Sequence, residues 1–300
     1  MPEIKHSFGN INLWTKDKLA RLGKYLPAYT KALSKKNFVL AYIDAFAGTG
    51  VINVEIKETP QNLFGFENGL EEELKDFIDG SAKIALKTEP QFHKYIFIEK
   101  NKDRFSELQK LKEEFPHLTD RIEIVNAEAN SFIQDLCKKD WIKNNRRAVM
   151  FLDPYGMQVS WKTIEAIANT KAIDLWILFP IGTVNRLLNK NGKINKGRRK
   201  SLDNLFGNED WFEMFFDERE RINLITQQPE KYFVKKASFE TIAQYFNDRL
   251  KSIFADVAPN PLFLTNSNNS PIFLLCFATG NPKGAPIAVR IAQNILKQKR

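Results

Sequence analysis

The sequence predicts an α/β fold in which a mostly parallel sheet carries helices on both faces. The first observation behind this prediction is a strict alternation of strand-like and helix-like segments between residues 94 and 179. The second is an apolar run at 38–43, typical of a strand buried on both faces, that leads into a turn of small residues. With 300 residues and 43% hydrophobic content, the chain can bury a full core as one extended domain, residues 1–300.

The elements follow in order along the first part of the chain. Apolar residues at helical spacing predict a leading helix over 16–35, inside a leading segment 1–37, before the strand at 38–43. Residues 51–79 are interpreted as an insertion, after which Ser81 is a candidate N-cap for the next helix. Strands are then predicted at 94–99, 121–125, 148–152 and 173–179, and helices at 102–115, 131–139 and 162–168.

The alternation is interrupted after Pro180. Residues 183–234 are interpreted as a basic and aromatic insertion or cap, containing a basic loop, an aromatic-rich helix around Trp211 and a turn near Pro229. Later elements are a helix at 239–254, two strands at 262–265 and 272–278 that pair like a hairpin, and a last helix at 286–296.

Charge and cysteine content limit the function classes. Lys and Arg number 45 against 36 Asp and Glu, which leaves a net charge of +9 and a pI near 9.3. This excess favours a polyanion partner, DNA or RNA, although many basic proteins bind no nucleic acid. The two cysteines, Cys137 and Cys276, lie far apart in apolar segments, so we expect neither a disulfide framework nor a cysteine zinc site.

Several other classes of site and location are excluded by pattern. The start of the chain lacks an apolar leader and no stretch is long enough to cross a bilayer, so we expect a soluble, cytoplasmic protein without a membrane partner. The three histidines are scattered, with no metal-ligand spacing beside them, so no metal site is predicted. No serine lies in a nucleophile elbow, and no Gly-Lys-Ser/Thr follows the glycine turn.

The turn after the first strand is the most informative stretch for function. Asp44 ends the strand and Phe46 follows it, while Gly48 and Gly50 can take backbone angles that other residues resist and let a ligand approach the main chain. Such a turn favours a ligand with a negative or nucleoside-like end. A simple tight turn explains the same residues, so the turn alone leaves both interpretations open.

Two further acids follow the next two predicted strands. In nucleotide-binding α/β folds an acid about 20 residues after the glycine turn takes the ribose hydroxyls. Glu99 lies 49 residues after Gly50, and removing the 29 residues of the insertion at 51–79 leaves 20. Glu99 is therefore a candidate ribose ligand, with a solvated strand end as the alternative. Glu128, after the third strand, can accept from an adenine amino group or act only as an N-cap.

Asp153-Pro154-Tyr155-Gly156 follows the fourth strand, at the edge where open α/β sheets bind ligands. The Asp153 carboxylate can accept a hydrogen bond from an amino group, Pro154 fixes the turn, and Tyr155 offers a face on which a flat base can stack. A plain turn in which Asp153 prepares the next helix has equal weight on these residues alone.

A basic cluster follows the fifth strand. Residues 189–200 contain six Lys or Arg residues and no acid, and we expect them to overhang the same sheet edge. A basic segment that contacts phosphates is one hypothesis and a solvated loop is the other. The residues assigned to phosphate contact are Lys196, Arg198, Arg199 and Lys200.

These motifs together resemble class I methyltransferases that use S-adenosylmethionine. The Phe-x-Gly-x-Gly form of the turn, beginning at Phe46, looks like the version found in nucleic-acid methyltransferases. More closely, the chain resembles the three-Cys-motif partner protein (TcmP) family, through residues 42–50, 80–87, 151–156 and 273–278. The resemblance implies a Rossmann-like, mostly parallel seven-stranded sheet with an antiparallel last strand, and S-adenosylmethionine as cofactor.

The resemblance also implies residue roles. Asp44, Phe46, Gly48 and Gly50 would line the methionine end of the donor, Glu99 the ribose and Glu128 the adenine. Asp153 and Pro154 fall where amino-methylating relatives carry Asp-Pro-Pro-Tyr, whose acid and proline carbonyl hold the target amino group. Tyr155 stands in place of the second proline and Gly156 in place of the aromatic residue, a departure that bears on amino methylation of a base.

Three functions follow as hypotheses. The first is an S-adenosylmethionine-dependent methyltransferase acting on nucleic acid, at the amino group of a base. The second is a non-catalytic or weakly catalytic partner that docks to a three-cysteine-motif companion protein in a mobile-element or defence system. The third, a nicotinamide enzyme, is disfavoured because the turn lacks a third glycine.

Overall fold

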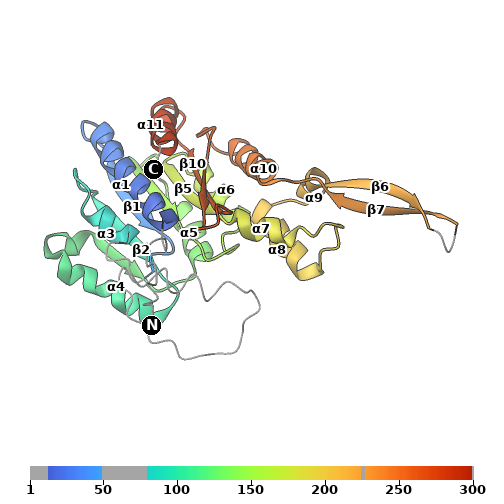
Figure 1. Ribbon diagram of the computed structural model, residues 1–300. Coiled ribbons are helices and arrows are strands. Elements are labelled where there is room, and N and C mark those ends of the chain that lie inside the picture. Colours follow the sequence, from blue (N-terminus) through green and yellow to red (C-terminus); the bar gives the residue numbers. More distant parts are fainter. Residues whose placement is uncertain (1–12, 49–79, 224–226, 299–300) are drawn as a thin grey trace, which may run out of the picture.

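The structure is a computed structural model that describes residues 13–48, 80–223 and 227–298. Its centre is a sheet of eight strands, flanked by helices (Figure 1). A separate two-stranded hairpin projects from one end of the molecule (Figure 1). The main strands, in their order across the sheet, are β3 (Ile122–Val125), β2 (Lys94–Ile98), β1 (Val39–Asp44), β4 (Arg146–Leu152), β5 (Ile173–Phe179), β10 (Pro271–Thr279) and β8 (Asp256–Val257), with β9 (Leu262–Thr265) also pairing with β10.

Strand direction confirms the predicted fold class. Strands β3, β2, β1, β4 and β5 run parallel, and β10, the last strand of the chain, pairs antiparallel with β5. The sheet is thus mostly parallel with an antiparallel last strand, as the resemblance to class I methyltransferases implies. The predicted pair at 262–265 and 272–278 is also confirmed, as β9 and β10. The short strand β8, which was not predicted, is the eighth strand of the sheet.

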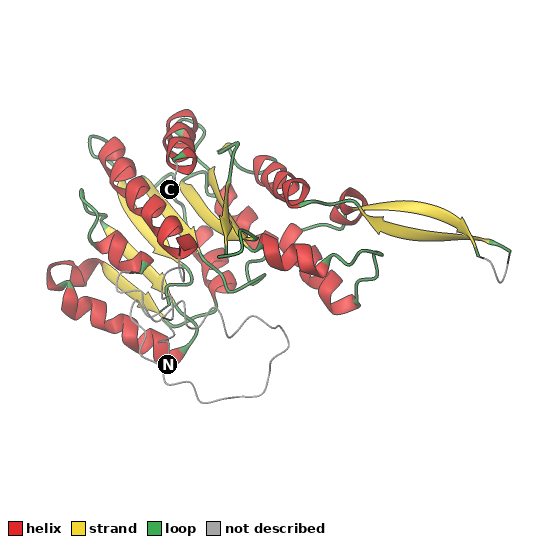
Figure 2. Ribbon diagram, in the orientation of Figure 1, coloured by secondary structure: helices red, strands yellow, loops and turns green. Residues whose placement is uncertain are grey.

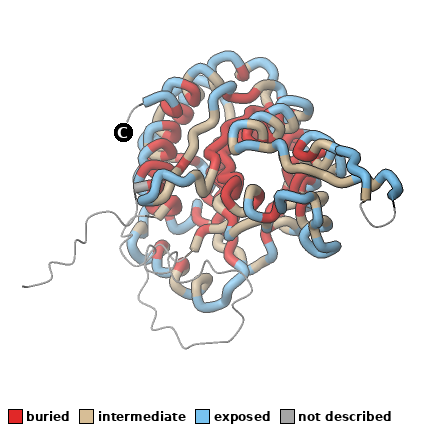
Figure 3. The backbone as a smooth tube through the Cα atoms, turned by 45° about the vertical axis from the view of Figure 1, so that its right-hand side comes forward, coloured by how far each residue is buried: buried red, intermediate tan, exposed pale blue. Residues whose placement is uncertain are grey.

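Side chains alternate across the sheet, so each strand contributes to two cores. In β1, Leu40 and Tyr42 belong to one core, and Ala41 and Ile43 belong to the other. Figures 2 and 3 show helices on both sides of the buried strands. One core lies under α1 (Leu13–Leu33), α3 (Ser81–Leu86), α4 (Lys102–Glu114) and α11 (Ala285–Lys297); the other lies under α5 (Ala129–Cys137), α6 (Trp161–Asn169), α7 (Ile181–Leu187) and α10 (Phe239–Lys251).

Local sequence explains where several of the described helices begin. Asn101 caps α4, Ser160 caps α6 and Ser238 caps α10, each through a side-chain oxygen that accepts from a backbone N–H of the first turn. The prediction that Ser81 caps the next helix is wrong, because Gly80 occupies the N-cap of α3. The Ser81 hydroxyl instead hydrogen-bonds to Asp44. A 3₁₀ turn, η1 (Pro116–Arg121), connects α4 to β3.

The region predicted as an insertion or cap, 183–234, contains more regular structure than expected. Its basic residues were predicted to form a loop, but residues from Lys196 onward form the helix α8 (Lys196–Phe206), whose apolar positions lie in its second half. The expected aromatic helix is α9 (Trp211–Phe215). The turn predicted near Pro229 lies directly before that residue, where the chain reverses between β6 (Phe216–Ile222) and β7 (Pro229–Lys235). These two strands, which were not predicted, form the projecting hairpin that we call the arm.

Three further expectations concern covalent links, membrane-spanning helices and the insertion after the glycine turn. Both cysteines are free thiols in the structure. None of the helices within the described ranges combines the length and apolarity needed to span a membrane. The predicted insertion at 51–79 lies outside the described residues, and so does Gly50.

Candidate functional site

Asp44 ends β1 as a fully buried carboxylate. The Tyr42 hydroxyl donates to its Oδ2 atom at 3.2 Å, and the Phe46 N–H donates to its Oδ1 atom at 3.4 Å. Burial raises the pKa of Asp44 to about 7; hydrogen bonds from Ser81, Phe46 and Tyr42 favour the charged form, whereas the charge of Asp153 opposes it. Asp44 therefore changes its charge near neutral pH.

The turn after Asp44 brings the backbone to the edge of the sheet. The Ala47 N–H donates to the Ile98 carbonyl at 3.3 Å, which joins the turn to the end of β2. Gly48 has φ +61°, a left-handed conformation that favours glycine. A Cβ atom at Gly48 would meet no atom of the described residues within 4 Å, so backbone conformation, and not crowding, explains this glycine. The open space beside it is compatible with a bound ligand.

Glu99 follows β2 and is 8% exposed. Its Oε1 atom accepts from the Asn101 N–H at 2.8 Å, and its backbone N–H donates to the Val125 carbonyl of β3. Within the described ranges, no hydrogen bond uses the Oε2 atom. One carboxylate oxygen of Glu99 is therefore available to a ligand hydroxyl.

Glu128 follows β3 and caps α5. Its carboxylate accepts from the backbone N–H groups of Asn130 and Ser131 at 3.0 and 2.9 Å, and from both of their side chains at 2.8 Å. Partial burial opposes the charge, but these hydrogen bonds prevail and lower the pKa of Glu128 to about 2. Of the two roles left open by the sequence, the structure displays the N-cap; the adenine contact stays a prediction.

The three acids lie at one edge of the sheet. They follow β1, β2 and β3, which are parallel neighbours, so their carboxyl ends meet at the same edge. Asp44 and Glu99 each keep a buried or nearly buried carboxylate there, whereas Glu128 is exposed and committed to its cap. The structure thus brings Asp44 and Glu99 together with the Ala47-Gly48 turn, and places Glu128 beside them on the adjacent strand.

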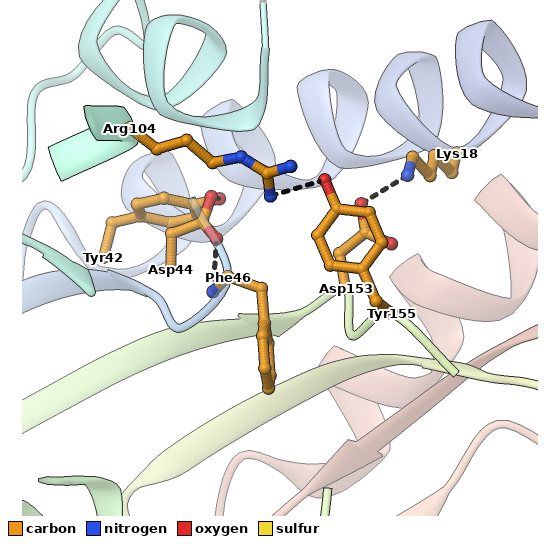
Figure 4. Close-up of polar contacts among 7 residues, drawn as sticks. All are labelled: Lys18, Tyr42, Asp44, Phe46, Arg104, Asp153 and Tyr155. Carbon is orange, nitrogen blue, oxygen red and sulfur yellow. Dashed lines mark hydrogen bonds and ion pairs between the residues drawn. The ribbon is translucent and has the colours of Figure 1, made fainter. Parts of the chain in front are cut away.

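Asp153 follows β4, which pairs with β1 on the other side of Asp44. Its carboxylate forms an ion pair with Lys18 of α1 through Oδ2, and its side chain is 24% exposed. Figure 4 shows Asp44 and Phe46 on one side, Asp153 and Tyr155 on the other, and Lys18 approaching Asp153 from α1. The two acids thus occupy one site at adjacent strand ends.

Tyr155 lies at the surface beside Asp153 and is 44% exposed. Its hydroxyl accepts a hydrogen bond from the Arg104 guanidinium at 3.0 Å, and Arg104 lies 5.1 Å from the ring centroid (Figure 4). Pro154 is buried and Gly156 has φ +68°. The turn therefore presents an aromatic ring to solvent next to a carboxylate, with one cation held against that ring.

Lys18 and Arg104 were missed by the sequence reasoning. Lys18 lies on a helix that its apolar spacing marked only as core, and no motif links it to the Asp153 turn, 135 residues later. Arg104 lies in the first turn of α4, five residues after Glu99, where nothing in the pattern separates it from neighbouring Lys100 and Lys102. Only the folded chain identifies both residues.

The basic residues lie apart from the acids. Lys196, Arg198, Arg199 and Lys200 belong to α8, on the β5 and β10 side of the sheet, and no ion pair among the described residues connects them to Asp44, Glu99 or Asp153 (Figure 1). Arg199 pairs with Glu209 at 3.1 Å and lies 4.8 Å from the Phe212 ring, so it contributes to the packing of its own region. The other three basic residues at the start of α8, Lys196, Arg198 and Lys200, are exposed.

The available groups fit an adenosine-bearing sulfonium compound. Glu99 offers a free carboxylate oxygen beside a turn with open space at Gly48. Asp44 offers a buried acid beside that turn, which suits a cationic group. Across 13–48, 80–223 and 227–298, no group of three or more His, Cys, Asp or Glu side chains is placed to hold a metal ion.

Comparisons with known proteins give likenesses of structure only. No protein-family model matches the chain, and no curated protein matches it. Similar solved structures include a protein from Legionella pneumophila of the DUF519 family, with a TM-score of 0.41 and 15% identity over 81% of this chain and 93% of that one. Spermidine synthase from Thermotoga maritima has a TM-score of 0.37 and 10% identity, over 89% of this chain and 59% of that one.

A methyltransferase is also among these structures. Precorrin-6y C5,15-methyltransferase from Geobacter metallireducens has a TM-score of 0.31 and 10% identity, over 78% of this chain and 91% of that one. Likenesses this distant do not identify an activity, so the argument for function depends on the site itself.

Proposed function

We propose that this protein is an S-adenosylmethionine-dependent methyltransferase that acts on nucleic acid, at the amino group of a base. The observation that carries the proposal is the meeting of three carboxylates, Asp44, Glu99 and Asp153, at the carboxyl ends of the adjacent parallel strands β1, β2 and β4. Open α/β sheets bind their ligands at this edge. The resemblance to the TcmP family adds the choice of methyl donor and remains a prediction.

Donor binding would use the end of β1 and the end of β2. The free oxygen of Glu99 would accept from the ribose hydroxyls, and Asp44 with the Ala47-Gly48 turn would face the methionine end. When bound, the donor supplies an activated methyl group, and the electron pair of the breaking carbon–sulfur bond stays on sulfur. Glu128 would contact the adenine from its place at the start of α5.

Acceptor binding would use the turn after β4. Asp153 and the Pro154 carbonyl would hold an amino group in line with the methyl group, so that the nitrogen lone pair forms the new bond. The nitrogen proton then leaves to solvent through the Asp153 carboxylate. Tyr155 supports a planar acceptor, because its exposed ring lies beside Asp153 and can stack on a base.

A nucleic-acid substrate is supported by charge. The protein carries a net charge of +9, and the exposed Lys196, Arg198 and Lys200 on α8 can neutralise phosphates. Arg199, which was grouped with them from the sequence, is a weaker candidate because it already pairs with Glu209.

A labelling experiment tests the proposed function. The purified protein is incubated with methyl-labelled S-adenosylmethionine and separate pools of DNA, RNA and protein, and the label in each pool is counted. We expect label in DNA or RNA, and at least a tenfold lower rate with Asp153→Asn. Label in protein alone would contradict the substrate class, and no label in any pool would contradict the transfer reaction.

The arm favours a second candidate function, that of a binding partner for a three-cysteine-motif companion protein. Strands β6 and β7 pair with each other and with no other described strand, so the arm presents two unpaired edges away from the main sheet (Figure 1). Co-expression with a three-cysteine-motif protein tests this function. A stable complex with no methyl transfer would favour it, and active transfer without complex formation would contradict it.

A further inference from the structure

Lys18 is an unusual residue for the buried face of a helix. It is 6% exposed, it pairs with Asp153, and its Nζ atom lies 4.7 Å from the centroid of the Trp14 ring. Removing an ammonium group and a carboxylate from water has a desolvation cost that an ion pair does not always recover. The pair is partly buried, with the Lys18 side chain 7% and the Asp153 side chain 24% exposed, so stability alone is a weak explanation for it.

Helix α1 has enough other contacts to stay in place without Lys18. Leu22, Tyr25 and Leu26 are each at most 1% exposed in the core under this helix. Arg21 of α1 also donates to the Gln298 carbonyl, directly after α11, at 2.8 Å. Anchoring of α1 does not explain why a lysine faces the Asp153 turn.

The ion pair with Lys18 uses only one of the two carboxylate oxygens of Asp153. Lys18 contacts Oδ2, and no hydrogen bond from a described residue uses Oδ1. A carboxylate held by a rigid helix through one oxygen has its second oxygen fixed in direction, which is what an acceptor amino group requires.

The same ion pair balances charge around Asp44. Burial raises the pKa of Asp44, and the negative charge of Asp153 raises it further. Lys18 is the cation that offsets Asp153. Among the described residues, the charged and titratable side chains around the two acids come from four elements. Tyr42 lies on β1 and Lys18 on α1, while Arg104 of α4 and Glu99 after β2 lie next to Tyr155. Ser81 of α3 adds a hydroxyl group.

From this geometry we infer that Lys18 is a positioning residue for methyl transfer, which orients Asp153 toward the acceptor and offsets its charge beside Asp44. This inference rests on the proposed function. It predicts that Lys18 acts on the reaction only through Asp153. A change to arginine retains the positive charge that offsets Asp153 and should therefore retain the role, although the guanidinium is larger than the ammonium group that it replaces.

Four variants test the inference: Lys18→Met, Lys18→Arg, Asp153→Asn and the double variant Lys18→Met/Asp153→Asn. Lys16→Met, the same change at an exposed position of α1, is the matched control. Methyl transfer to the DNA or RNA pool is measured from pH 5.5 to 8.5, donor binding is measured by calorimetry at the same pH values, and thermal unfolding reports folding.

We expect Lys18→Met to lower the transfer rate at least tenfold and to move the pH midpoint of donor binding upward by at least half a pH unit. The sign follows because donor binding uses the ionised form of Asp44, whose pKa is about 7. Without Lys18 the charge of Asp153 is not offset, so the pKa of Asp44 rises and donor binding requires a higher pH. Lys18→Arg should restore most of the rate, and the double variant should be no slower than Asp153→Asn.

Two outcomes overturn the inference alone while the wild type is active. One is a Lys18→Met variant with wild-type rate and pH profile; the other is a variant whose only change is a lower unfolding temperature, since that result makes Lys18 purely structural. If the rate losses of Lys18→Met and Asp153→Asn add in full in the double variant, Lys18 acts independently of Asp153, which also contradicts the inference. A wild type that neither binds donor nor transfers label overturns the proposed function and this inference together.

Discussion

The Tyr25 hydroxyl on α1 donates a 2.7 Å hydrogen bond to the Asp174 carboxylate on β5. Thr279 of β10 donates to the same carboxylate at 2.6 Å. Burial nevertheless raises the pKa of Asp174 to about 6, and the hydrogen bonds from Thr279 and Tyr25 only partly oppose this effect. The hydrogen bond between Tyr25 and Asp174 therefore joins α1 to the sheet through a carboxyl group that is poorly stabilised in its charged form.

We predict that Asp174 makes the protein less stable as pH rises from about 4 to about 6. In this window the folded chain holds a proton on Asp174 that the unfolded chain has released, so the free energy of unfolding falls with pH. Raising the pKa from 3.8 to about 6 corresponds to on the order of 3 kcal/mol. Urea unfolding of wild type and Asp174→Asn at pH 4 and pH 7 measures the difference.

The matched control for this prediction is Asp135→Asn, at an exposed position of α5. The difference in free energy of unfolding between Asp135→Asn and wild type should be the same at pH 4 and pH 7 within about 0.5 kcal/mol. Equal pH dependence in wild type and Asp174→Asn would show that the buried acid does not titrate in this window.

Glu128 can be tested for its two roles separately. Serine is also a good N-cap, so Glu128→Ser should keep α5 nearly as stable as in wild type, whereas Glu128→Ala should lose about 1 kcal/mol. If the carboxylate also contacts the donor, both variants should bind S-adenosylmethionine more weakly. Calorimetry and thermal unfolding give the two readouts, and unchanged affinity in both variants would leave Glu128 as a cap alone.

The exposed cations of α8 should set the salt dependence of nucleic-acid binding. Reversing Lys196, Arg198 and Lys200 to glutamate removes up to three phosphate contacts, so the slope of log K against log salt should decrease in magnitude by about 2–3. Fluorescence anisotropy with a labelled oligonucleotide at several salt concentrations measures this slope.

A control with the same change in net charge is available at the opposite edge of the sheet. Lys139, Lys143 and Lys171 are exposed and precede β4 or β5, away from the candidate site. Their reversal should leave the slope close to wild type. Equal slopes in wild type and the α8 variant would remove the basic helix from the account.

The end of α8 gives a prediction about stability. Gly207 is the C-cap with φ +75°, and a Cβ there would lie 2.1 Å from Cδ1 of Trp161. Gly207→Ala should therefore destabilise the protein by about 2 kcal/mol or more. Gly197, exposed in the same helix, is the matched comparison, since its Cβ would come no closer than 3.7 Å to another group. Gly197→Ala should be neutral or stabilising by up to about 1 kcal/mol, by urea unfolding.

The central sheet could be predicted from the sequence because its elements are locally encoded. Apolar runs buried on both faces and amphipathic helices with their own caps alternate from β2 to β5, and strand 173–179 was predicted to its ends. Asp44, Glu99 and Asp153 followed from the same logic, because parallel strands place their carboxyl ends at one edge. Strand order, more than any single motif, is what places these three acids at adjacent strand ends.

The remaining features depend on contacts that sequence pattern does not encode. The arm was missed because β6 alternates charges instead of apolar and polar residues, and its cross-strand pairing, such as Arg221 with Glu230, is visible only in the folded hairpin. Lys18 and Arg104 were missed because each reaches its partner through tertiary packing. The adenine role of Glu128, by contrast, is left as a prediction.

The central claim is that the ends of β1 and β2 bind S-adenosylmethionine, and calorimetry tests it most directly. The donor is titrated into wild type, Glu99→Gln and Glu107→Gln, the last being a partly exposed control on α4. The account predicts saturable binding to wild type and to Glu107→Gln, and at least tenfold weaker binding to Glu99→Gln. No binding to wild type, or equal affinity in all three proteins, would contradict it.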